Sequence, residues 1–456
     1  MAVSRKLLRN KAVIDAVAAS LVRHVPPHAR LTLALSGGLD SIVLLHVLLA
    51  LRDQHLFELR AVHVHHGLSP HADDWADFCA RLCAAHHVEV TVHRVRIARD
   101  DPAGIEAAAR RERQRIFAAL DTDFLLTAHQ QNDQAETLLL QLLRGAGPKG
   151  LSAMADVQSH PEWRAFQLRP LLNMTRADLW GYAQAQGLAW VEDESNHDLR
   201  YRRNALRQQV MPLLDAHFPG ASITLARAAA LQAETAELLD DLAELDSRTA
   251  ISGDRLDCAV LATLSVPRAR NVLRHFIGQR GFAMPNLRRL NEALHQLLDA
   301  HPAARVCVNL GEAEVHRFRG GAYLVPARVY TAQAPLVWQG ESVLDMESIG
   351  VRVALTPTLG SGLKRALLDA GRVELRLRQG RERIRLAPGG PHRTLKNLLH
   401  ESAIPPWERD RIPLLLFNGQ LVWAAGIGID ADYLAESGEP GLLPACVAEE
   451  ESAWGG

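Results

Sequence analysis

The chain has 456 residues, 48% of them hydrophobic and 23% charged, and its formal net charge is −1. This length predicts roughly two to four domains of a soluble globular protein with a sizeable core. Five scattered cysteines argue against a disulfide framework, and no apolar stretch is long enough for a signal sequence or a membrane span. We therefore expect a cytoplasmic protein with no membrane partner.

Charge is divided unevenly along the chain. The segment 228–257 carries eight acidic and two basic residues, whereas the segment 364–411 carries twelve basic and six acidic residues. A basic C-terminal segment on a neutral protein is typical of binding to a polyanion such as RNA, although charge runs also occur on ordinary solvated surfaces.

The N-terminal part alternates between strand and helix patterns. Apolar, strand-like runs occur at 31–35, 59–64, 88–97 and 124–127, and helical periodicity occurs at 6–22, 42–51, 69–85 and 104–120. This alternation predicts an α/β domain with a parallel sheet covered by helices on both faces.

A glycine turn joins the first of these strands to the next helix. Its residues are Ser36, Gly37, Gly38, Leu39, Asp40 and Ser41. Paired glycines reach backbone angles closed to other residues, and the first N–H groups of the helix point outward, which predicts a phosphate-binding loop. The lysine of a Walker A loop is missing, so amides, hydroxyls and a metal ion would meet the charge. The alternative is that Asp40 or Ser41 only caps the helix.

A second polar group follows the strand at 124–127. His129 ends this strand and Asp133 opens the next helix, with Glu136 three residues later. Because ligands of parallel sheets gather at the carboxyl ends of the strands, we expect this group to lie near the glycine loop, together with His65, His66 and Gly67. A histidine and a carboxylate there suit a Mg²⁺ or general-base site. Asp133 and Glu136 also have the spacing of a capping box, and spacing alone leaves both interpretations open.

The style of the sequence changes after Pro219. Helical runs at 222–245, 267–279 and 286–298 predict a separate helical domain over 219–330. Strand-like runs at 304–310 and 322–326 follow the last of these helices within the same domain. Glycines and prolines predict a linker with short strands over 331–370. The last domain, 371–447, is predicted to be small, basic and α+β, with a hairpin turn at Asn418-Gly419 between strands 413–417 and 420–424.

Two basic tracks are candidates for contact with an RNA backbone. One follows the C-terminal arginines at 376, 378, 381, 383 and 385, and the other lies on the helix that bears Arg203 and Arg207. Alternate arginines on a strand suit phosphates, although a solvated hairpin is the plain alternative. Aromatic residues make up only 5% of the chain, so we expect recognition by backbone and shape, with one base delivered to the active site.

Several motifs resemble a known family. Ser36–Ser41 resembles the SGGxDS loop of the PP-loop ATP pyrophosphatases, and further segments resemble the tRNA(Ile)-lysidine synthases. These segments are TAHQQNDQAET at 127–137, HHGLSPHADDW at 65–75, RGAG at 144–147 with Gly150-Leu151, RPLL at 169–172, the run 190–207, and Leu395-Lys396, Ile404-Pro405 and Gly426–Gly428. The chain departs from the family at Gln130 and Asn132, where many members carry a histidine and an aspartate.

The resemblance implies a fold and an activity. The N-terminal domain, 1–218, would be a PP-loop (adenine nucleotide hydrolase-like) catalytic domain, and the later domains would bind tRNA. ATP would adenylate C2 of the wobble cytidine in the CAU anticodon of isoleucine tRNA, and L-lysine would displace AMP to give lysidine. Another PP-loop tRNA-modifying enzyme, a thiolase, is the alternative, but only Cys79 and Cys83 could supply its cysteine pair.

The resemblance also implies roles for individual residues. The loop Ser36–Ser41 would hold the pyrophosphate of ATP, Asp40 and Asp133 would carry Mg²⁺, and Asp133 or His129 would take a proton from the lysine amine. The residues expected to bind tRNA are Arg203, Arg207, Arg376, Arg378, Arg381, Arg383 and Lys396. The oligomeric state stays open, with a homodimer as one option.

Overall fold

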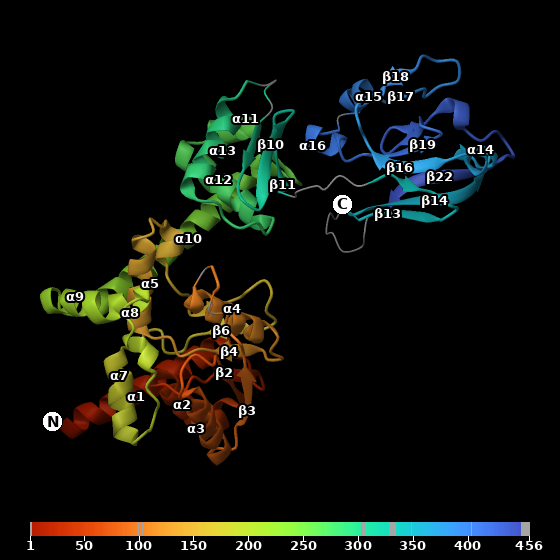
Figure 1. Ribbon diagram of the computed structural model, residues 1–456. Coiled ribbons are helices and arrows are strands. Elements are labelled where there is room, and N and C mark those ends of the chain that lie inside the picture. Colours follow the sequence, from red (N-terminus) through yellow and green to blue (C-terminus); the bar gives the residue numbers. More distant parts are fainter. Residues whose placement is uncertain are drawn as a thin grey trace. The chain divides into compact units, whose positions relative to one another are not determined.

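The computed structural model describes residues 2–447 except 99, 103, 302–303, 305, 328–333, 348 and 403, and it leaves the side chains of 2–9 and 195–196 undescribed. The chain divides into two compact units, Met1–Leu242 and Ala243–Gly456 (Figure 1). No helix in the described part of the chain is long and apolar enough to cross a membrane.

The first unit is built on a six-stranded sheet in the order β3-β2-β1-β4-β6-β5. Its neighbouring strands pair in parallel except β5 and β6. The strands are β1 (Arg30–Ala34), β2 (Glu58–His65), β3 (Glu89–Arg94), β4 (Phe124–Leu126), β5 (Val157–Gln158) and β6 (Phe166–Leu168). The order reverses between β1 and β4, which is the topological switch point where ligands of open α/β sheets bind.

Helices cover both faces of this sheet, as the alternating patterns predicted. The helices up to the unit boundary are α1 (Ala2–His24), α2 (Leu39–His55), α3 (Ala72–Ala85), α4 (Ile105–Ala118), α5 (Gln131–Leu142), α6 (Pro148–Leu151), α7 (Arg176–Gln186), α8 (Arg202–Ala205), α9 (Met211–His217) and α10 (Ala221–Ala250), with a 3₁₀ turn at Glu194–His197 and a π turn at Leu206–Val210. Of these, α1, α2, α3 and α7 pack in the core on one side of the sheet and α4 packs on the other.

Side chains alternate between the two faces, so neighbouring residues enter different cores. Leu126 of β4 packs with α1, α2, α3 and α7 in the larger core, whereas Leu125 packs with Ile116 and Phe117 of α4 on the other side. The predicted α/β class with helices on both faces is therefore confirmed.

The second unit begins within α10 and contains a five-stranded sheet in the order β7-β8-β11-β10-β9. Its elements are β7 (Ile251–Ser252), β8 (Arg255–Asp257), α11 (Cys258–Thr263), α12 (Val266–Gln279), α13 (Leu287–Asp299), β9 (Val306–Asn309), β10 (Ala313–Phe318) and β11 (Gly321–Pro326). The helices α12 and α13 were expected at 267–279 and 286–298, whereas α11 was not, and all three share a core with the sheet. The segment thus contains more strand than its helical periodicity suggested.

The rest of the second unit is mainly strand. Its elements are β12 (Leu336–Val337), β13 (Val343–Met346), β14 (Val351–Leu359), β15 (Leu363–Lys364), α14 (Arg365–Asp369), β16 (Val373–Leu377), β17 (Arg383–Ile384), β18 (Arg393–Thr394), α15 (Leu395–Glu401), α16 (Pro406–Arg409), β19 (Pro413–Phe417), β20 (Gln420–Ala424), β21 (Gly428–Ile429), a 3₁₀ turn (Ala431–Tyr433) and β22 (Pro440–Val447). They form sheets in the orders β12-β16-β19-β20-β21, β13-β14-β22-β15 and β17-β18.

The segment expected to be a linker with short strands contributes to the hydrophobic core of these sheets. β14 pairs with β22 over eight residues, and its Val353 and Leu355 are buried. The glycines that suggested a linker lie at the turns between strands, where Gly340, Gly350 and Gly360 have positive φ angles. The expected hairpin at Asn418-Gly419 is present, with both residues at positive φ, as a type I′ turn requires.

Candidate active site

The loop from Ser36 to Ser41 leaves the carboxyl end of the central strand β1 and enters α2. Ser41 Oγ donates to the Gly38 carbonyl at 2.9 Å and lies 3.1 Å from Ser36 Oγ. Gly37 has φ +85°, and its carbonyl accepts the Val191 N–H at 2.9 Å. A Cβ on Gly37 would lie 2.8 Å from Val191 Cγ2, so both backbone angle and space require glycine there.

Asp40 lies in the first turn of α2 and has no role as its cap, because the N-cap position is Gly38. Among the described residues, none gives the buried Oδ1 atom of Asp40 a hydrogen bond. Burial, with a further contribution from Asp133, raises the pKa of Asp40 to about 6, while Arg176 and Arg207 act in the opposite direction. A buried carboxylate oxygen without a donor is a fitting ligand for a cation.

His129 lies just beyond the end of β4, next to β1 in the sheet. Its Nδ1 is 3.0 Å from Thr127 Oγ1, which also accepts a hydrogen bond from Gln167 Nε2 at 3.1 Å. Burial is the main cause that lowers the pKa of His129, and the positive charges of Arg169 and Arg203 lower it further. The imidazole is therefore neutral at neutral pH.

Asp133 and Glu136, at the start of α5, form a buried network with two arginines. Asp133 Oδ1 accepts from Nη2 of Arg203 at 3.0 Å and of Arg207 at 2.9 Å. Glu136, whose side chain is 1% exposed, accepts from Nε of the same arginines at 2.8 and 2.6 Å. Two carboxylates and two guanidinium groups balance in charge, which makes their burial tolerable.

The capping box at the start of α5 is formed by another pair of residues than the predicted Asp133 and Glu136. Asp133 Oδ2 accepts the Gln130 N–H at 3.0 Å, and the Gln130 side chain accepts the Asn132 N–H at 2.7 Å. Asp133 therefore caps the helix together with Gln130, whereas Glu136 serves the arginines. Asp133 thus has a capping role and also forms ion pairs with the arginines, and its proposed Mg²⁺ or general-base role stays a prediction.

The two positions that depart from the family motif both have structural contacts. Gln130 is the N-cap just described. Asn132 Nδ2 donates to Ser222 Oγ at 3.3 Å, and its Oδ1 accepts the Arg176 N–H at 3.1 Å. Both side chains are neutral, so they add no charge beside Asp40 and Asp133.

Three arginines that our sequence analysis did not assign also influence this site. Arg176 lowers the pKa of Asp40, and Arg169 and Arg113 lower that of His129. Arg169 is buried and donates to the oxygens of Ala155, Gln158 and Gln167. The sequence could have indicated this role, because Arg169 directly follows β6 in an Arg-Pro-Leu-Leu run and the carboxyl ends of parallel strands lie at one edge of the sheet.

The predicted tRNA-binding residues differ in exposure. Arg203 and Arg207 are engaged with the two carboxylates, and Arg376 and Arg378 are paired with Glu382 and Asp410, with side chains only 14% and 12% exposed. By contrast, three of the predicted residues are exposed on the surface around β17 and α15: Arg381, Arg383 and Lys396.

Cys79 and Cys83 are fully buried on α3 within the larger core. Burial raises the pKa of the Cys79 thiol to about 12 and that of Cys83 to about 11. Both thiols are therefore protonated and inaccessible, which makes them poor sulfur carriers or cluster ligands.

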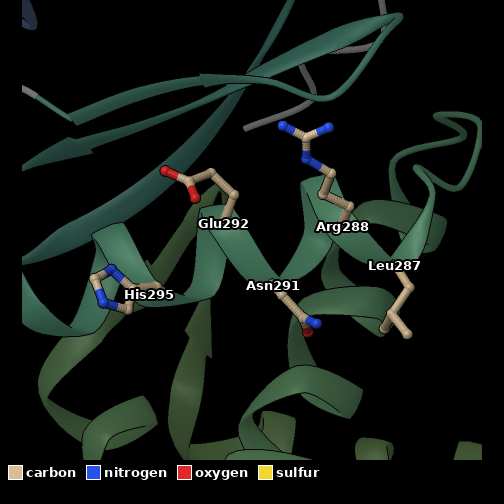
Figure 2. A pocket seen from close by; sticks show the side chains of 5 residues that line it. All are labelled: Leu287, Arg288, Asn291, Glu292 and His295. Carbon is tan, nitrogen blue, oxygen red and sulfur yellow. The ribbon is translucent and has the colours of Figure 1, made fainter.

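A shallow hollow in the second unit lies on the outer side of α13 (Figure 2). Its lining residues are Leu287, Arg288, Asn291, Glu292 and His295. None of these is a predicted site residue, and the side chains spread along one helix without converging on a common point. We therefore retain the carboxyl ends of β1 and β4 as the candidate active site, and not this hollow.

Three family models match successive parts of the chain. The model described as PP-loop domain matches residues 10–214, that described as TilS substrate binding domain matches 256–323, and that described as TilS substrate C-terminal domain matches 373–445.

Curated relatives extend over nearly the whole chain. A tRNA(Ile)-lysidine synthase of Azoarcus sp. (strain BH72) is 44% identical over 93% of this chain and 93% of its own. That of Nitrosomonas europaea is 41% identical over 95% of each. Among solved structures, the U34-tRNA thiolase NcsA from Methanococcus maripaludis aligns with 49% of this chain and 78% of its own at 19% identity and a TM-score of 0.42. Because that likeness is low, the assignment depends on the sequence relatives and the family models: the chain belongs to the tRNA(Ile)-lysidine synthase family.

Proposed function

We propose that this protein uses ATP to join L-lysine to C2 of the wobble cytidine in the CAU anticodon of isoleucine tRNA. The observation that carries the proposal is the meeting of the Ser36–Ser41 loop with His129 and Asp133 at the carboxyl ends of the adjacent strands β1 and β4. The family membership supplies the reaction. The thiolase alternative is less supported, because the buried Cys79 and Cys83 are unsuited to it.

The first step would take place at the loop. The C2 oxygen of the cytidine attacks the α-phosphorus of ATP, and pyrophosphate leaves. The amides of Gly37 and Gly38 and the hydroxyls of Ser36 and Ser41 would bind the departing phosphates. Asp40 would hold Mg²⁺, with Asp133 as the second predicted carboxylate, and bound Mg²⁺ neutralises charge on the leaving group. Asp133 could approach the ion only if Arg203 or Arg207 released it, so the orphaned oxygen of Asp40 is the better-supported ligand.

The second step needs a base. The lysine amine attacks C2, AMP leaves with the C–O bond electrons, and the amine loses a proton. Both oxygens of Asp133 already accept hydrogen bonds, from Gln130 and from the two arginines. His129 is neutral, and with its proton on Nδ1 toward Thr127 it would present Nε2 as the acceptor. An anionic ligand beside Arg169 and Arg203 would raise the low pKa of His129 and make it a stronger base.

Transfer RNA would be bound partly by the exposed basic surface around β17 and α15, through Arg381, Arg383 and Lys396. Arg376 and Arg378 remain predicted contacts in the same domain. Arg203 and Arg207 would reach tRNA only by opening their ion pairs with Asp133 and Glu136.

The direct test is nucleoside mass spectrometry of isoleucine tRNA incubated with the protein, ATP and lysine. We expect a lysidine nucleoside, one AMP and one pyrophosphate per modified tRNA. Omission of lysine should leave pyrophosphate release on the first turnover without lysidine. A thiolated nucleoside, or tRNA that stays unmodified under all conditions, would refute the proposal.

A further inference from the structure

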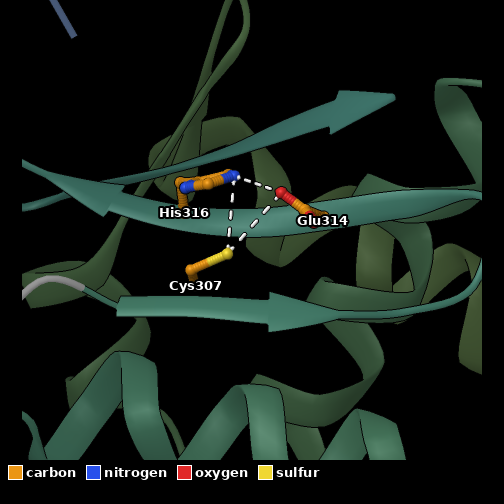
Figure 3. A group of neighbouring side chains, drawn as sticks. All are labelled: Cys307, Glu314 and His316. Atoms are coloured by element: carbon orange, nitrogen blue, oxygen red, sulfur yellow. Dashed lines mark hydrogen bonds and ion pairs between the residues drawn. The ribbon is translucent and has the colours of Figure 1, made fainter. Parts of the chain in front are cut away.

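Three side chains of different chemistry converge on one face of the sheet in the second unit, outside the site described above. They are Cys307 on β9 and Glu314 and His316 on β10 (Figure 3). Cys307 and His316 are direct cross-strand partners in the antiparallel β9–β10 pair. Glu314 precedes His316 by two residues and therefore lies on the same face of the strand. The register of the sheet, and not a loop, holds the three groups together.

The distances between their donor atoms suit one small cation. Cys307 Sγ is 3.8 Å from His316 Nε2 and 3.6 Å from Glu314 Oε2, and Oε2 is 3.0 Å from Nε2. In a tetrahedral zinc site, metal–ligand distances of about 2.0–2.3 Å place neighbouring donor atoms roughly 3.3–3.6 Å apart. Each distance here is within about 0.4 Å of that range, so rotation of the side chains alone would complete the geometry.

The cluster is also chemically suited to a metal ion and open to it. Hydrogen bonds now connect the three groups, and a cation would replace the shared protons. Cys307 is exposed, which gives the ion an entry path and leaves room for a water as the fourth ligand.

We propose that Cys307, Glu314 and His316 form a zinc(II) site that links β9 to β10. Thiolate, imidazole and carboxylate together favour Zn²⁺ over Mg²⁺ or Ca²⁺, which take mainly oxygen ligands. The site lies in the part of the chain matched by the substrate-binding-domain model. It is independent of the proposed ATP chemistry and would persist in a catalytically inactive variant.

Cobalt(II) titration of the tag-free, chelator-treated full chain tests this proposal, because a cobalt–thiolate bond gives a charge-transfer band in the near ultraviolet. We expect one equivalent of Co²⁺ to produce this band together with the intense visible bands of tetrahedral cobalt, and Zn²⁺ to abolish both. Zn²⁺ should also raise the melting temperature of the second unit. Cys307→Ser should remove the thiolate band, and His316→Gln should weaken Co²⁺ binding at least about tenfold.

The matched control is Cys446→Ser, which removes another exposed cysteine of the same unit. It should keep the full cobalt spectrum and affinity. Absence of a stoichiometric thiolate band in the wild type would overturn the proposal, as would a band that survives Cys307→Ser or disappears in Cys446→Ser. Circular dichroism of each variant shows that it is folded before titration.

Discussion

Replacement of Asp40 by asparagine is expected to stabilise the ligand-free protein while it abolishes pyrophosphate release. The carboxyl has its ordinary pKa of 3.8 in the unfolded chain and about 6 in the fold, mainly because of burial. The native state therefore holds a proton that the unfolded chain has already lost between these values, and stability falls as pH rises through this interval. At about 1.4 kcal/mol per pKa unit, the charged Asp40 costs at most about 3 kcal/mol above pH 7.

Asp40→Asn removes this cost, so its advantage should be largest near pH 8 and vanish near pH 4. In a unit of this size, about 3 kcal/mol corresponds to a rise in melting temperature of roughly 6–12 °C. The matched control is Asp53→Asn, which makes the same charge change in α2 at a side chain that is 94% exposed. Thermal unfolding of the three proteins across this pH range measures the effect.

Magnesium separates the two parts of this reasoning. If Asp40 is the cation ligand, Mg²⁺ should raise the melting temperature of the wild type and of Asp53→Asn but not of Asp40→Asn. An Asp40→Asn protein that is no more stable than Asp53→Asn at pH 8, or an advantage that does not shrink on acidification, would refute the electrostatic argument. Pyrophosphate release near the wild-type rate would refute the catalytic role.

Three further predictions concern the base, the loop and the tRNA surface. His129→Gln should still bind ATP but slow lysine incorporation by a factor of about 10² to 10⁴; a rate within a few-fold of wild type would transfer the role to Asp133. Gly37→Ala should lose pyrophosphate release and melt earlier, whereas Gly38→Ala, at φ −74° with its nearest contact 3.5 Å away, should fold normally; equal melting temperatures would contradict the packing argument. On the exposed basic surface, the residues to replace by glutamate are Arg381, Arg383 and Lys396. This charge reversal should lower the slope of log binding constant against log salt concentration for tRNA by about 0.7–0.9 per lost phosphate contact, and it should leave ATP affinity unchanged. An unchanged slope would indicate an ordinary solvated surface.

Local patterns predicted the framework of the first unit well. Apolar runs predicted β1 to β4 but not the short strands β5 and β6. Because parallel strands share one carboxyl edge, the sequence alone could bring the Ser36–Ser41 loop near His129 and Asp133. The Asn418-Gly419 turn was also predictable, because a turn with two residues at positive φ has a strong local signature.

Contacts between distant segments were not predictable in this way. Arg203 is 70 residues from Asp133, and no periodicity indicates that its guanidinium turns inward to a carboxylate instead of outward to RNA. The pairing of β14 with β22 is equally non-local, and its glycines and prolines locally resemble those of a linker. Burial of Asp40 also depends on the surrounding fold, so its raised pKa has no signature in the hexapeptide itself.

Asn132 connects the candidate active site to two other helices through hydrogen bonds. Its amide joins the first turn of α5, which carries Asp133, to the first turn of α7 through Arg176 and to the first turn of α10 through Ser222. The helix α10 then continues from the first unit into the second. We therefore expect a shift of α5 on nucleotide binding to reach the start of the helix that leads into the second unit, through Asn132 and through the apolar cluster that α5 shares with Leu225 of α10.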